Sequence, residues 1–357
     1  MTERDAMARA LALAWRGWGR VQPNPLVGAV VLHDDRIVGE GWHAEFGGAH
    51  AEAVALADAG SRASGGTVVC TLEPCTHQGK RPPCTDALLA AGVHRVVVAL
   101  SDPNPTAAGG TARLRAAGVE VEVGLLADEA TAQNALFLHL QTDATRPFVA
   151  LKLATTIDGR IADAGGRSRW LSGEPAREFV HWLRAGFDAV AVGGATARTD
   201  DPSLSVRGNL QPRVPPRRVV FAADGDVPRA LGLVRTARDT PTIAVLGPAA
   251  PTPAAQALEA AGVEVIRASS LAAALKALRG AGIDSVLVEG GGRLAGALLA
   301  DGLVNRYYWI QTPRWLGSGG VAAVAGLPTT ALEDAPSWRV TDRRPLGDDT
   351  LLVLDRP

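Results

Sequence analysis

The sequence predicts an α/β protein of two domains, and three observations support this prediction. The chain of 357 residues is longer than a single hydrophobic core usually organises. Short apolar segments alternate with segments of helical periodicity, which is typical of sheets covered by helices. A polar break, QTDATRP at residues 141–147, separates two such series. We therefore expect a first domain over residues 1–144 and a second over residues 148–357.

The first domain is predicted to begin with a surface helix in the first 20 residues, where apolar positions recur at helical spacing. Two strands follow at 26–33 and 36–43, and Asp34 and Asp35 form the turn between them. The remaining elements alternate: a helix at 49–60, a strand at 66–73, a helix at 84–92, a strand at 93–100, a helix at 109–118 and a strand at 119–126.

The second domain is predicted to open with strands within 148–162. A helix follows at 174–186, with Pro175 in its first turn, where proline is favoured. Ala-rich helices then separate further apolar strands, which we expect at 187–194, 217–225, 242–247, 263–268 and 284–292.

Charge and composition exclude several classes of protein. The net charge of −1 provides no global basic field that would hold a nucleic acid. No apolar run approaches the roughly 18 residues of a membrane-spanning helix, and the N-terminus has no signal-peptide pattern. We therefore expect a cytoplasmic protein without a membrane partner. The three cysteines are too few, and odd in number, for a disulfide scaffold.

Two of these cysteines, Cys75 and Cys84, lie in TLEPCTHQGKRPPC, downstream of the HAE motif formed by His50 and Glu52. One imidazole and two thiolates give zinc three protein ligands and leave a fourth position for an activated water molecule. Glu52, at the start of a helix, can carry a proton from that water to a ring nitrogen and then to leaving ammonia. This is the nucleobase-deaminase signature, except that eight residues rather than two separate the cysteines.

Other interpretations of this region remain open. A structural zinc with His77 as its fourth ligand would leave Glu52 without a role. His43 is either a site residue or an ordinary histidine at a strand end. Cys70, in an apolar strand, is expected to fill the core. His77 and Lys80 are otherwise expected to face the substrate from the loop between the two cysteines.

A second candidate site lies at EGGGRLAGALL, residues 289–299, where a strand runs through three glycines into a helix. Free amides at such a helix start bind phosphate, although an ordinary glycine turn is the alternative interpretation. No GxGxxG fingerprint joins a strand to a helix in this domain, so the usual dinucleotide-binding fold is not supported.

Long motifs in both halves of the chain resemble the bifunctional deaminase/reductase family of riboflavin biosynthesis. They are PNPLVGAVV, GEGWH, GGAHAEAVAL, TLEPCTHQGKRPPC and DPNP, then KLATTIDGRIA, GRSRWLSG, REFVHWLRAGFDAVAVGGATARTDDPSLSVR and EGGG. The resemblance covers nearly the whole chain. It implies a cytidine-deaminase-like three-layer α/β domain followed by a dihydrofolate-reductase-like α/β domain.

The resemblance also implies two successive reactions on a small phosphoribosylaminopyrimidine. The zinc-dependent first domain would convert 2,5-diamino-6-(5-phosphoribosylamino)pyrimidin-4-one to 5-amino-6-(5-phosphoribosylamino)uracil. The second domain would then use NADPH to reduce the ribosyl group to ribityl, by hydride transfer to C1′. The resemblance further implies a homo-oligomer, a dimer or larger.

The same resemblance assigns residues to both sites. His50, Cys75 and Cys84 would hold the zinc ion, and Glu52 would be the proton shuttle. The substrate would be held by Asn24 in the deaminase and by Ser168, Arg184, Leu204, Arg207 and Glu289 in the reductase. NADPH would be held by Ala154, Trp170, Thr196, Asp200, Gly291, Gly292, Arg293, Leu294, Ala295, Gly296 and Ala297.

Some of these assignments have ordinary alternatives. Arg184 and Arg207 suit a phosphate-bearing substrate, since guanidinium binds phosphate through two hydrogen bonds. Arg184 is otherwise a solvated helix end, and Trp170 is otherwise a core aromatic residue. Lys152 and Asp200 are the candidate proton donors for the reduction. The candidates for selecting the 2′-phosphate of NADPH over NADH are Arg198, Arg217 and Arg218.

Three positions depart from the family's usual pattern. TTIDG replaces SLDG, Ala135 follows Asn134 where an arginine is usual, and Asn305 replaces an aspartate. None lies in the zinc motif, so only the domain junction and the reductase rim are affected.

Three competing functions remain. A deaminase with a non-catalytic second domain would not bind NADPH. A nucleic-acid-editing deaminase would need a basic groove and stacking aromatics, and aromatic residues make up only 4% of the chain. A zinc-stabilised binding module would give Glu52 no function.

Overall fold

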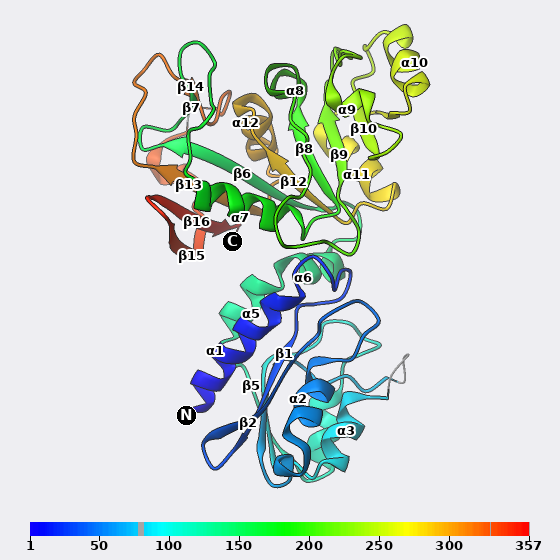
Figure 1. The fold of residues 1–357 in the computed structure, drawn as a ribbon, viewed down its shortest axis with the longest axis vertical. Coiled ribbons are helices and arrows are strands. Elements are labelled where there is room, and N and C mark those ends of the chain that lie inside the picture. Colours follow the sequence, from blue (N-terminus) through cyan, green and yellow to red (C-terminus); the bar gives the residue numbers. More distant parts are fainter. Residues whose placement is uncertain (78–81, 329, 357) are drawn as a thin grey trace. The chain divides into compact units, whose positions relative to one another are not determined.

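A computed structural model describes residues 1–77, 82–328 and 330–356. The chain divides into two compact units, Met1–Thr142 and Asp143–Pro357 (Figure 1). Each unit is described by itself. Among the described residues, every helix is too short or too polar to cross a lipid bilayer.

The first unit is built on a five-stranded sheet of order β2-β1-β3-β4-β5. β1 pairs antiparallel with β2 and β3, whereas β3, β4 and β5 run parallel. The strands are β1 (Gly28–His33), β2 (Arg36–Trp42), β3 (Thr67–Leu72), β4 (Arg95–Leu100) and β5 (Glu120–Val123). Asp34 and Asp35 join β1 to β2 with φ values of 47° and 56°, which suit a two-residue hairpin turn.

Helices cover both faces of this sheet, so the unit has three layers. They are α1 (Glu3–Ala14), η1 (Trp15–Gly17), α2 (Ala51–Ala59), η2 (Gly60–Ala63), α3 (Cys84–Ala90), α4 (Gly110–Ala116), α5 (Ala127–Gln133) and α6 (Ala135–Thr142). On one face, α1 and α5 contribute Met7, Leu13 and Ala130 to the core. On the other face, Leu88 and Leu114 come from α3 and α4 and pack with alanines of α2. The predicted three-layer α/β fold is confirmed, and α5 and α6 are helices that the sequence pattern did not predict.

Helix α2 lies directly against β2 because two glycines let the backbones approach. A Cβ atom on Gly41 would lie 2.3 Å from the carbonyl oxygen of Ala51, and one on Gly39 would lie 2.3 Å from that of Ala55. Real Cβ contacts do not reach such distances. The glycines therefore determine where α2 begins, and with it the positions of His50 and Glu52.

Substitution of Gly41 by alanine is expected to destabilise the first unit by about 1–3 kcal/mol, because α2 must move away from β2. Thermal denaturation followed by circular dichroism measures the effect. The control is Gly280→Ala, since a Cβ there would meet nothing within 4 Å; because Gly280 is in helix α11, stability should stay the same or rise by up to about 1 kcal/mol. Equal melting curves for both variants would contradict the close packing of α2.

The second unit contains a nine-stranded sheet of order β11-β10-β9-β8-β12-β6-β13-β16-β15. The first seven strands of this order, β11, β10, β9, β8, β12, β6 and β13, run parallel to one another. β16 then pairs antiparallel with β13, and β15 pairs antiparallel with β16. They are β6 (Phe148–Thr156), β8 (Ala189–Gly193), β9 (Arg217–Phe221), β10 (Thr242–Leu246), β11 (Glu264–Arg267), β12 (Ser285–Glu289), β13 (Arg306–Thr312), β15 (Arg339–Leu346) and β16 (Asp349–Asp355). Separately, β7 (Arg160–Ala162) pairs with β14 (Val321–Ala322).

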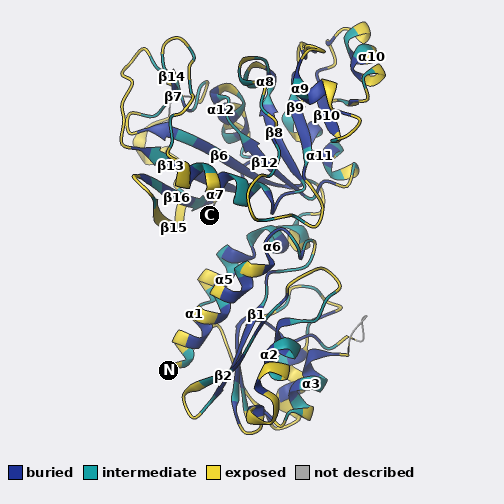
Figure 2. Ribbon diagram, in the orientation of Figure 1, coloured by how far each residue is buried: buried dark blue, intermediate teal, exposed yellow. Residues whose placement is uncertain are grey.

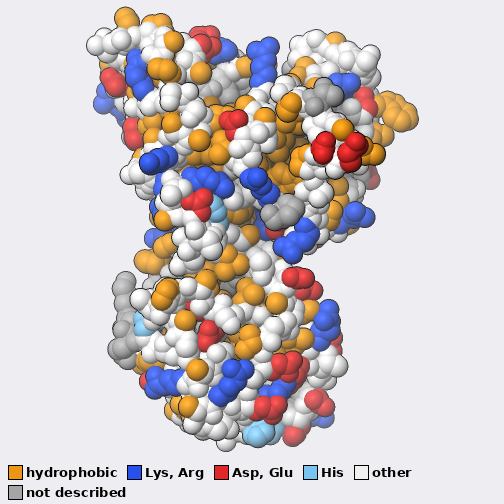
Figure 3. Space-filling view, turned by 180° about the vertical axis from the view of Figure 1, so that it is seen from behind, with side chains coloured by type: hydrophobic (Ala, Val, Ile, Leu, Met, Phe, Trp, Pro, Cys, Tyr) orange, Lys and Arg blue, Asp and Glu red, His pale blue; other side chains and the backbone are white. Residues whose placement is uncertain are grey.

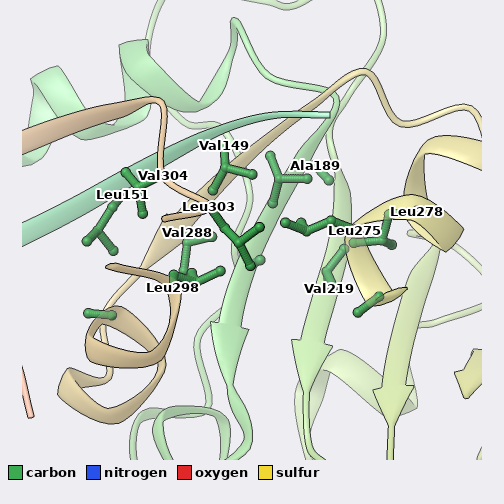
Figure 4. Packing of buried hydrophobic residues seen from close by; sticks show 14 of the residues in the cluster. Val149, Leu151, Ala189, Val219, Leu275, Leu278, Val288, Leu298, Leu303 and Val304 are labelled. Carbon is green, nitrogen blue, oxygen red and sulfur yellow. The ribbon is translucent and has the colours of Figure 1, made fainter. Parts of the chain in front are cut away.

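Helices also cover both faces of this larger sheet. They are α7 (Glu174–Arg184), α8 (Gly194–Asp200), α9 (Gly232–Arg235), α10 (Thr252–Ala260), α11 (Leu271–Gly280), α12 (Gly292–Ala300) and η3 (Leu332–Asp334). On one face, α11 and α12 pack Leu275 and Leu298 against strand residues such as Val149 and Val288 (Figure 4). On the other, Leu258 of α10 belongs to a second core cluster. The strands are mostly buried and the outer faces of the helices are exposed (Figure 2).

The strands predicted between residues 187 and 292 correspond to β8 to β12. The structure adds the C-terminal strands β13, β15 and β16, which were not individually predicted. Arg306 of β13 and Asp355 of β16 form a buried ion pair with Nε–Oδ1 and Nη2–Oδ2 distances of 2.6 and 2.7 Å. Directly before Arg306, Asn305 Oδ1 accepts hydrogen bonds from Arg146 and from the amide of Val149. On the face shown in Figure 3, basic and acidic side chains are interspersed rather than gathered in one basic band.

Candidate active sites

Three candidate metal ligands meet where α2 and α3 begin. His50 is the N-cap of α2, Cys84 is the first residue of α3, and Cys75 lies in the segment after β3. Their ligand atoms all lie within 4.8 Å of one another. His50 Nδ1 is 3.2 Å from Cys84 Sγ and 3.5 Å from Cys75 Sγ. The structure therefore brings together the three residues that were predicted as ligands.

This donor set fits a zinc ion. With Zn–N and Zn–S distances of about 2.1 and 2.3 Å, nitrogen and sulfur ligands of a tetrahedral site lie about 3.6 Å apart. The observed separations of 3.2 and 3.5 Å are close to that value. Among the described residues, His77 does not belong to the ligand group. Three protein ligands are the pattern of a catalytic zinc site, in which one position stays open for water.

The two cysteines are electrostatically suited to a metal. The hydrogen bond from the Cys84 thiol lowers the pKa of Cys75 to about 4, and the same interaction raises the pKa of Cys84. The backbone amide of Cys84 also donates to Cys75 Sγ at 3.4 Å. Cys75 is therefore the readier of the two to become a thiolate, the form that binds metals, and a bound metal would displace the proton of Cys84.

Glu52 lies in the first turn of α2 and is only 3% exposed. Burial raises the pKa of its carboxyl group to about 6. The carboxyl group forms a hydrogen bond with the Cys84 side chain but is not a member of the ligand group. A carboxyl group with a pKa near neutrality both accepts and donates protons readily, which is the property of a general acid–base catalyst.

His50, Glu52 and Cys75 line a cavity of about 220 Å³, and Asn24 also lines it. Asn24 Nδ2 lies 3.1 Å from His43 Nε2, and His43 Nδ1 lies 3.0 Å from the carbonyl oxygen of Ala49. Burial lowers the pKa of His43, so the ring is neutral. Because its Nδ1–H donates to the carbonyl, Nε2 accepts from the Asn24 amide, and Asn24 Oδ1 becomes the acceptor for a ligand. His43 therefore belongs to the site and is not an ordinary strand-end histidine.

The cavity has further lining residues that the sequence interpretation did not assign. Asp102 and Asn104 come from the DPNP motif, and Phe137 comes from α6. The motif was a usable signal for the first two, whereas no local pattern marked Phe137. His77 lines the cavity as predicted. Lys80, predicted to face the substrate, lies outside the described residues.

A second, larger cavity of about 1060 Å³ lies in the second unit. Most of the predicted cofactor and substrate residues line it: Ala154, Ser168, Trp170, Arg184, Thr196, Asp200, Leu204, Arg207, Glu289, Gly291, Gly292 and Arg293. The described lining does not include Leu294, Ala295, Gly296 or Ala297. A Cβ on Gly296 would lie 1.9 Å from the carbonyl oxygen of Ala325, so backbone already covers that face of α12. Trp170 is 66% exposed and is therefore not a core residue.

The residues that lead into α12 are glycines, and their backbone forms a cradle at the start of the helix. Gly290 and Gly291 have φ values of 72° and 85°, in the region that favours glycine. A Cβ on Gly291 would lie 2.9 Å from Thr196 Oγ1. The backbone can therefore approach a ligand closely at the start of a helix, where free amides bind phosphate. A cavity of this size with such a cradle fits NADPH.

Charged side chains meet at one end of this cavity. Arg184 Nε and Nη2 bind the two carboxylate oxygens of Glu289 at 2.6 and 3.0 Å, and Nη1 donates to the carbonyl oxygen of Ser205 at 2.8 Å. Both side chains are only 12% exposed, so Arg184 is not a solvated helix end. Lys152 of β6 is the register partner of Glu289. Burial lowers the pKa of Lys152, and the Glu289 carboxylate partly opposes this effect.

The three arginines that were candidates for selecting NADPH are not in the described lining of this cavity. Arg198 pairs with Asp226 at 3.2 Å. Arg217 pairs with Glu264. Arg218 is buried, and its guanidinium donates to Thr236 and to the carbonyl oxygens of two other residues. The basic residues that do line the cavity include Arg207 and Arg293, which makes them better placed to meet a phosphate.

The two units together define a zinc-dependent deaminase joined to a nucleotide-dependent reductase. A family model described as the cytidine and deoxycytidylate deaminase zinc-binding region matches residues 1–100. A second model, the RibD C-terminal domain, matches residues 147–352.

Full-length relatives identify the family. The riboflavin biosynthesis protein RibD of Aquifex aeolicus is 37% identical, with 99% of this chain and 98% of the relative aligned. The Escherichia coli protein of the same name is 38% identical, with 99% of both chains aligned. The solved structure of Acinetobacter baumannii RibD, form 1, has a TM-score of 0.81 and 35% identity over 99% of this chain and 98% of that one.

The chain therefore belongs to the RibD family. It is a bifunctional deaminase and reductase of riboflavin biosynthesis, with zinc as the cofactor of the first activity and NADPH as that of the second. The predicted dihydrofolate-reductase-like class of the second domain is likewise confirmed.

Proposed function

We propose that residues 1–144 remove the 2-amino group of 2,5-diamino-6-(5-phosphoribosylamino)pyrimidin-4-one by hydrolysis. Residues 148–357 then reduce the ribosyl group of 5-amino-6-(5-phosphoribosylamino)uracil to ribityl with NADPH. A Thermotoga maritima protein described as a diaminohydroxyphosphoribosylaminopyrimidine deaminase/5-amino-6-(5-phosphoribosylamino)uracil reductase supports these substrates. Its structure has 34% identity and a TM-score of 0.80 over 99% of both chains.

The observation that carries the proposal is the convergence of His50, Cys75 and Cys84 beside the buried carboxyl group of Glu52. When bound there, zinc supplies Lewis-acid activation of a water molecule near neutral pH. Glu52 would take one proton from that water and deliver it to the pyrimidine ring nitrogen, and would then carry the second, from the hydroxyl group added to the carbon, to the departing amino group. Asn24, oriented by His43, holds the ring through its Oδ1 acceptor.

In the reductase, NADPH supplies the hydride. Gly291 and Thr196 lie at the cradle for its phosphates, and the cavity walls keep water from the reacting carbon. Arg207 meets the phosphate of the substrate, while the Arg184–Glu289 pair fixes the position of Lys152. Lys152 donates the proton that the opening of the ribose ring requires. A lysine with a lowered pKa suits this role.

Removal of the metal tests whether zinc is needed for deamination and not for reduction. After dialysis against a zinc chelator, deamination is expected to fall to background, because the cavity then lacks its Lewis acid. Added zinc should restore it. Reduction of the deaminated intermediate by NADPH should be the same before and after dialysis, since the candidate metal ligands found among the described residues are all in the deaminase. A chelated, metal-free chain that still deaminates would contradict the proposal.

Two further parts of the proposal concern the state of the protein. We propose a cytoplasmic homo-oligomer, a dimer or larger, on the basis of the family resemblance. Light scattering of the purified chain measures its mass directly, and a monomer mass at micromolar concentration would contradict the oligomer.

A further inference from the structure

Part of the deaminase cavity is formed by chain that lies beyond the zinc-binding region. That region ends at residue 100, but Phe137 of α6 lines the same cavity as Glu52 and Asn24. Asn134, three residues earlier, lies at the C-terminal end of α5 and is only 3% exposed. Neither side chain has a role in the chemistry described above.

Asn134 binds the backbone of a segment that is distant in sequence. Its Oδ1 accepts from the amide of Leu26 at 2.8 Å, and its Nδ2 donates to the carbonyl oxygen of Leu26 at 3.0 Å. The two residues are 108 positions apart. One side-chain amide therefore satisfies both backbone groups of Leu26, in the way that a neighbouring strand would.

The segment around Leu26 precedes β1 and is held by individual hydrogen bonds. Pro23 and Pro25 flank Asn24, and proline has no amide hydrogen to donate. The amide of Asn24 donates to the carbonyl oxygen of Val21 at 2.9 Å, and β1 begins only at Gly28. The Asn134 clamp on Leu26 is therefore one of the long-range ties that place Asn24 in the cavity, together with the hydrogen bond from the His43 amide to the carbonyl oxygen of Val27 and the contact between the Asn24 and His43 side chains.

The Phe137 ring supplies an aromatic surface to a cavity whose lining has both polar and apolar side chains. The ring is buried, and the lining around it includes Pro25 and Val27 as well as the polar Asn24. A flat aromatic surface suits contact with a pyrimidine ring, because the two can stack or meet edge to face.

We infer that Asn134 and Phe137 complete the deaminase site. Asn134 is a positioning residue that fixes Leu26 and through it Asn24, and Phe137 is the wall against which the pyrimidine packs. This inference rests on the proposed deamination. It makes the end of the first unit part of the substrate site and not only a connection to the second.

The test compares the full-length, zinc-loaded chain with its Asn134→Ala and Asn134→Asp variants in steady-state deamination of the diaminopyrimidinone phosphate. Both variants are expected to raise KM about tenfold with a smaller change in kcat, since substrate placement is lost while the metal chemistry is retained. Asn134→Asp keeps the acceptor for the Leu26 amide but turns a buried carboxylate oxygen toward the Leu26 carbonyl oxygen, so its effect should be at least as large as that of alanine. Zinc content and the rate of the NADPH reaction should not change.

Gln133 provides a matched control for a merely structural role. It is the neighbouring buried amide, 7% exposed, and its Nε2 donates to the carbonyl oxygen of Leu11 in α1 at 2.8 Å. Gln133→Ala removes a comparable buried hydrogen bond, the one that joins α5 to α1, and leaves the Leu26 segment untouched. Its KM should match that of the unaltered chain. Equal increases of KM in Gln133→Ala and Asn134→Ala would overturn the positioning role.

Phe137 is tested by Phe137→Leu and Phe137→Ala. Leucine keeps the apolar volume and loses the flat ring, so we expect KM to rise a few fold with leucine and about tenfold with alanine. An unchanged KM in Phe137→Ala would overturn the proposed packing of the pyrimidine against Phe137.

A readout without substrate separates this inference from the proposed function. Hydrogen exchange of peptides that cover Leu26 should accelerate in Asn134→Ala and not in Gln133→Ala. Unchanged exchange would overturn the clamp even if the unaltered chain deaminates normally. Conversely, an unaltered chain that leaves the substrate intact would overturn the proposed deamination and the substrate roles of both residues, whatever the exchange shows.

Discussion

Replacement of Glu52 by glutamine is expected to slow deamination by about 10²–10⁴-fold, the usual contribution of a general acid–base catalyst. Glutamine has nearly the same shape as glutamate but cannot shuttle a proton between water, the ring nitrogen and the leaving amino group. Because Glu52 is not one of the metal ligands, the zinc content should stay at one ion per chain. Single-turnover deamination and metal analysis on the same sample measure both quantities.

The matched control is Glu129→Gln, which changes an exposed glutamate in the first turn of α5. It should deaminate at the rate of the unaltered chain. The NADPH reaction of both variants should also be unaltered. If Glu52→Gln deaminated as fast as the control, the proton shuttle would have to be another group, and the assignment of the site would be wrong.

Replacement of Lys152 by methionine is expected to lower the rate of reduction by about 10²–10⁴-fold, since the proton donor is lost. Deamination should continue, and the deaminated intermediate should accumulate. Lys276→Met is the control, because Lys276 is an exposed lysine of α11 and lies outside the described lining of the cavity. An unchanged rate of reduction in Lys152→Met would move the role of proton donor to Asp200.

The pH dependence of the rate of reduction in Glu289→Gln is a second test of Lys152 as the proton donor. A proton donor works only below its pKa, so the rate of reduction falls as pH rises through the pKa of Lys152. Burial and Arg184 lower this pKa, and the Glu289 carboxylate raises it. Tyr308 of β13 is the register partner of Lys152 on its other side. Removal of the Glu289 charge should therefore shift the alkaline limb of the profile to lower pH. A limb that stays in place would exclude Lys152 as the titrating group.

The fold was predictable wherever local pattern decided the structure. Alternation of apolar strands and helices identified both units, and Asp34–Asp35 predicted the hairpin turn. Helices α5 and α6 were missed because they are short and because the N-cap of α5 is Leu126, whose φ of 55° is not signalled by a residue such as glycine. Strand β15 was missed because its residues are mostly exposed and include several arginines.

The site residues show the same difference between those marked by a local motif and those joined by long-range contacts. His50, Glu52, Cys75 and Cys84 form a short motif whose spacing already reflects the geometry of the metal site. By contrast, the Arg184–Glu289 pair joins residues 105 positions apart, and the Asn134–Leu26 clamp has a similar reach. Gly296 was expected to hold phosphate, but the approach of Ala325 to it depends on how a distant segment packs. Such contacts are properties of the tertiary structure, which one sequence without its relatives does not reveal.

We expect the chain to carry two working sites that act in succession. The most direct test is mass spectrometry of the products formed by the purified, zinc-loaded chain from the diaminopyrimidinone phosphate, with and without NADPH. Without NADPH the account predicts that the product has lost the 2-amino group and gained oxygen. With NADPH it predicts the same product carrying two further hydrogens on the ribosyl group. If the deaminated compound accumulated despite saturating NADPH, the second unit would not be a working reductase and this expectation would be contradicted.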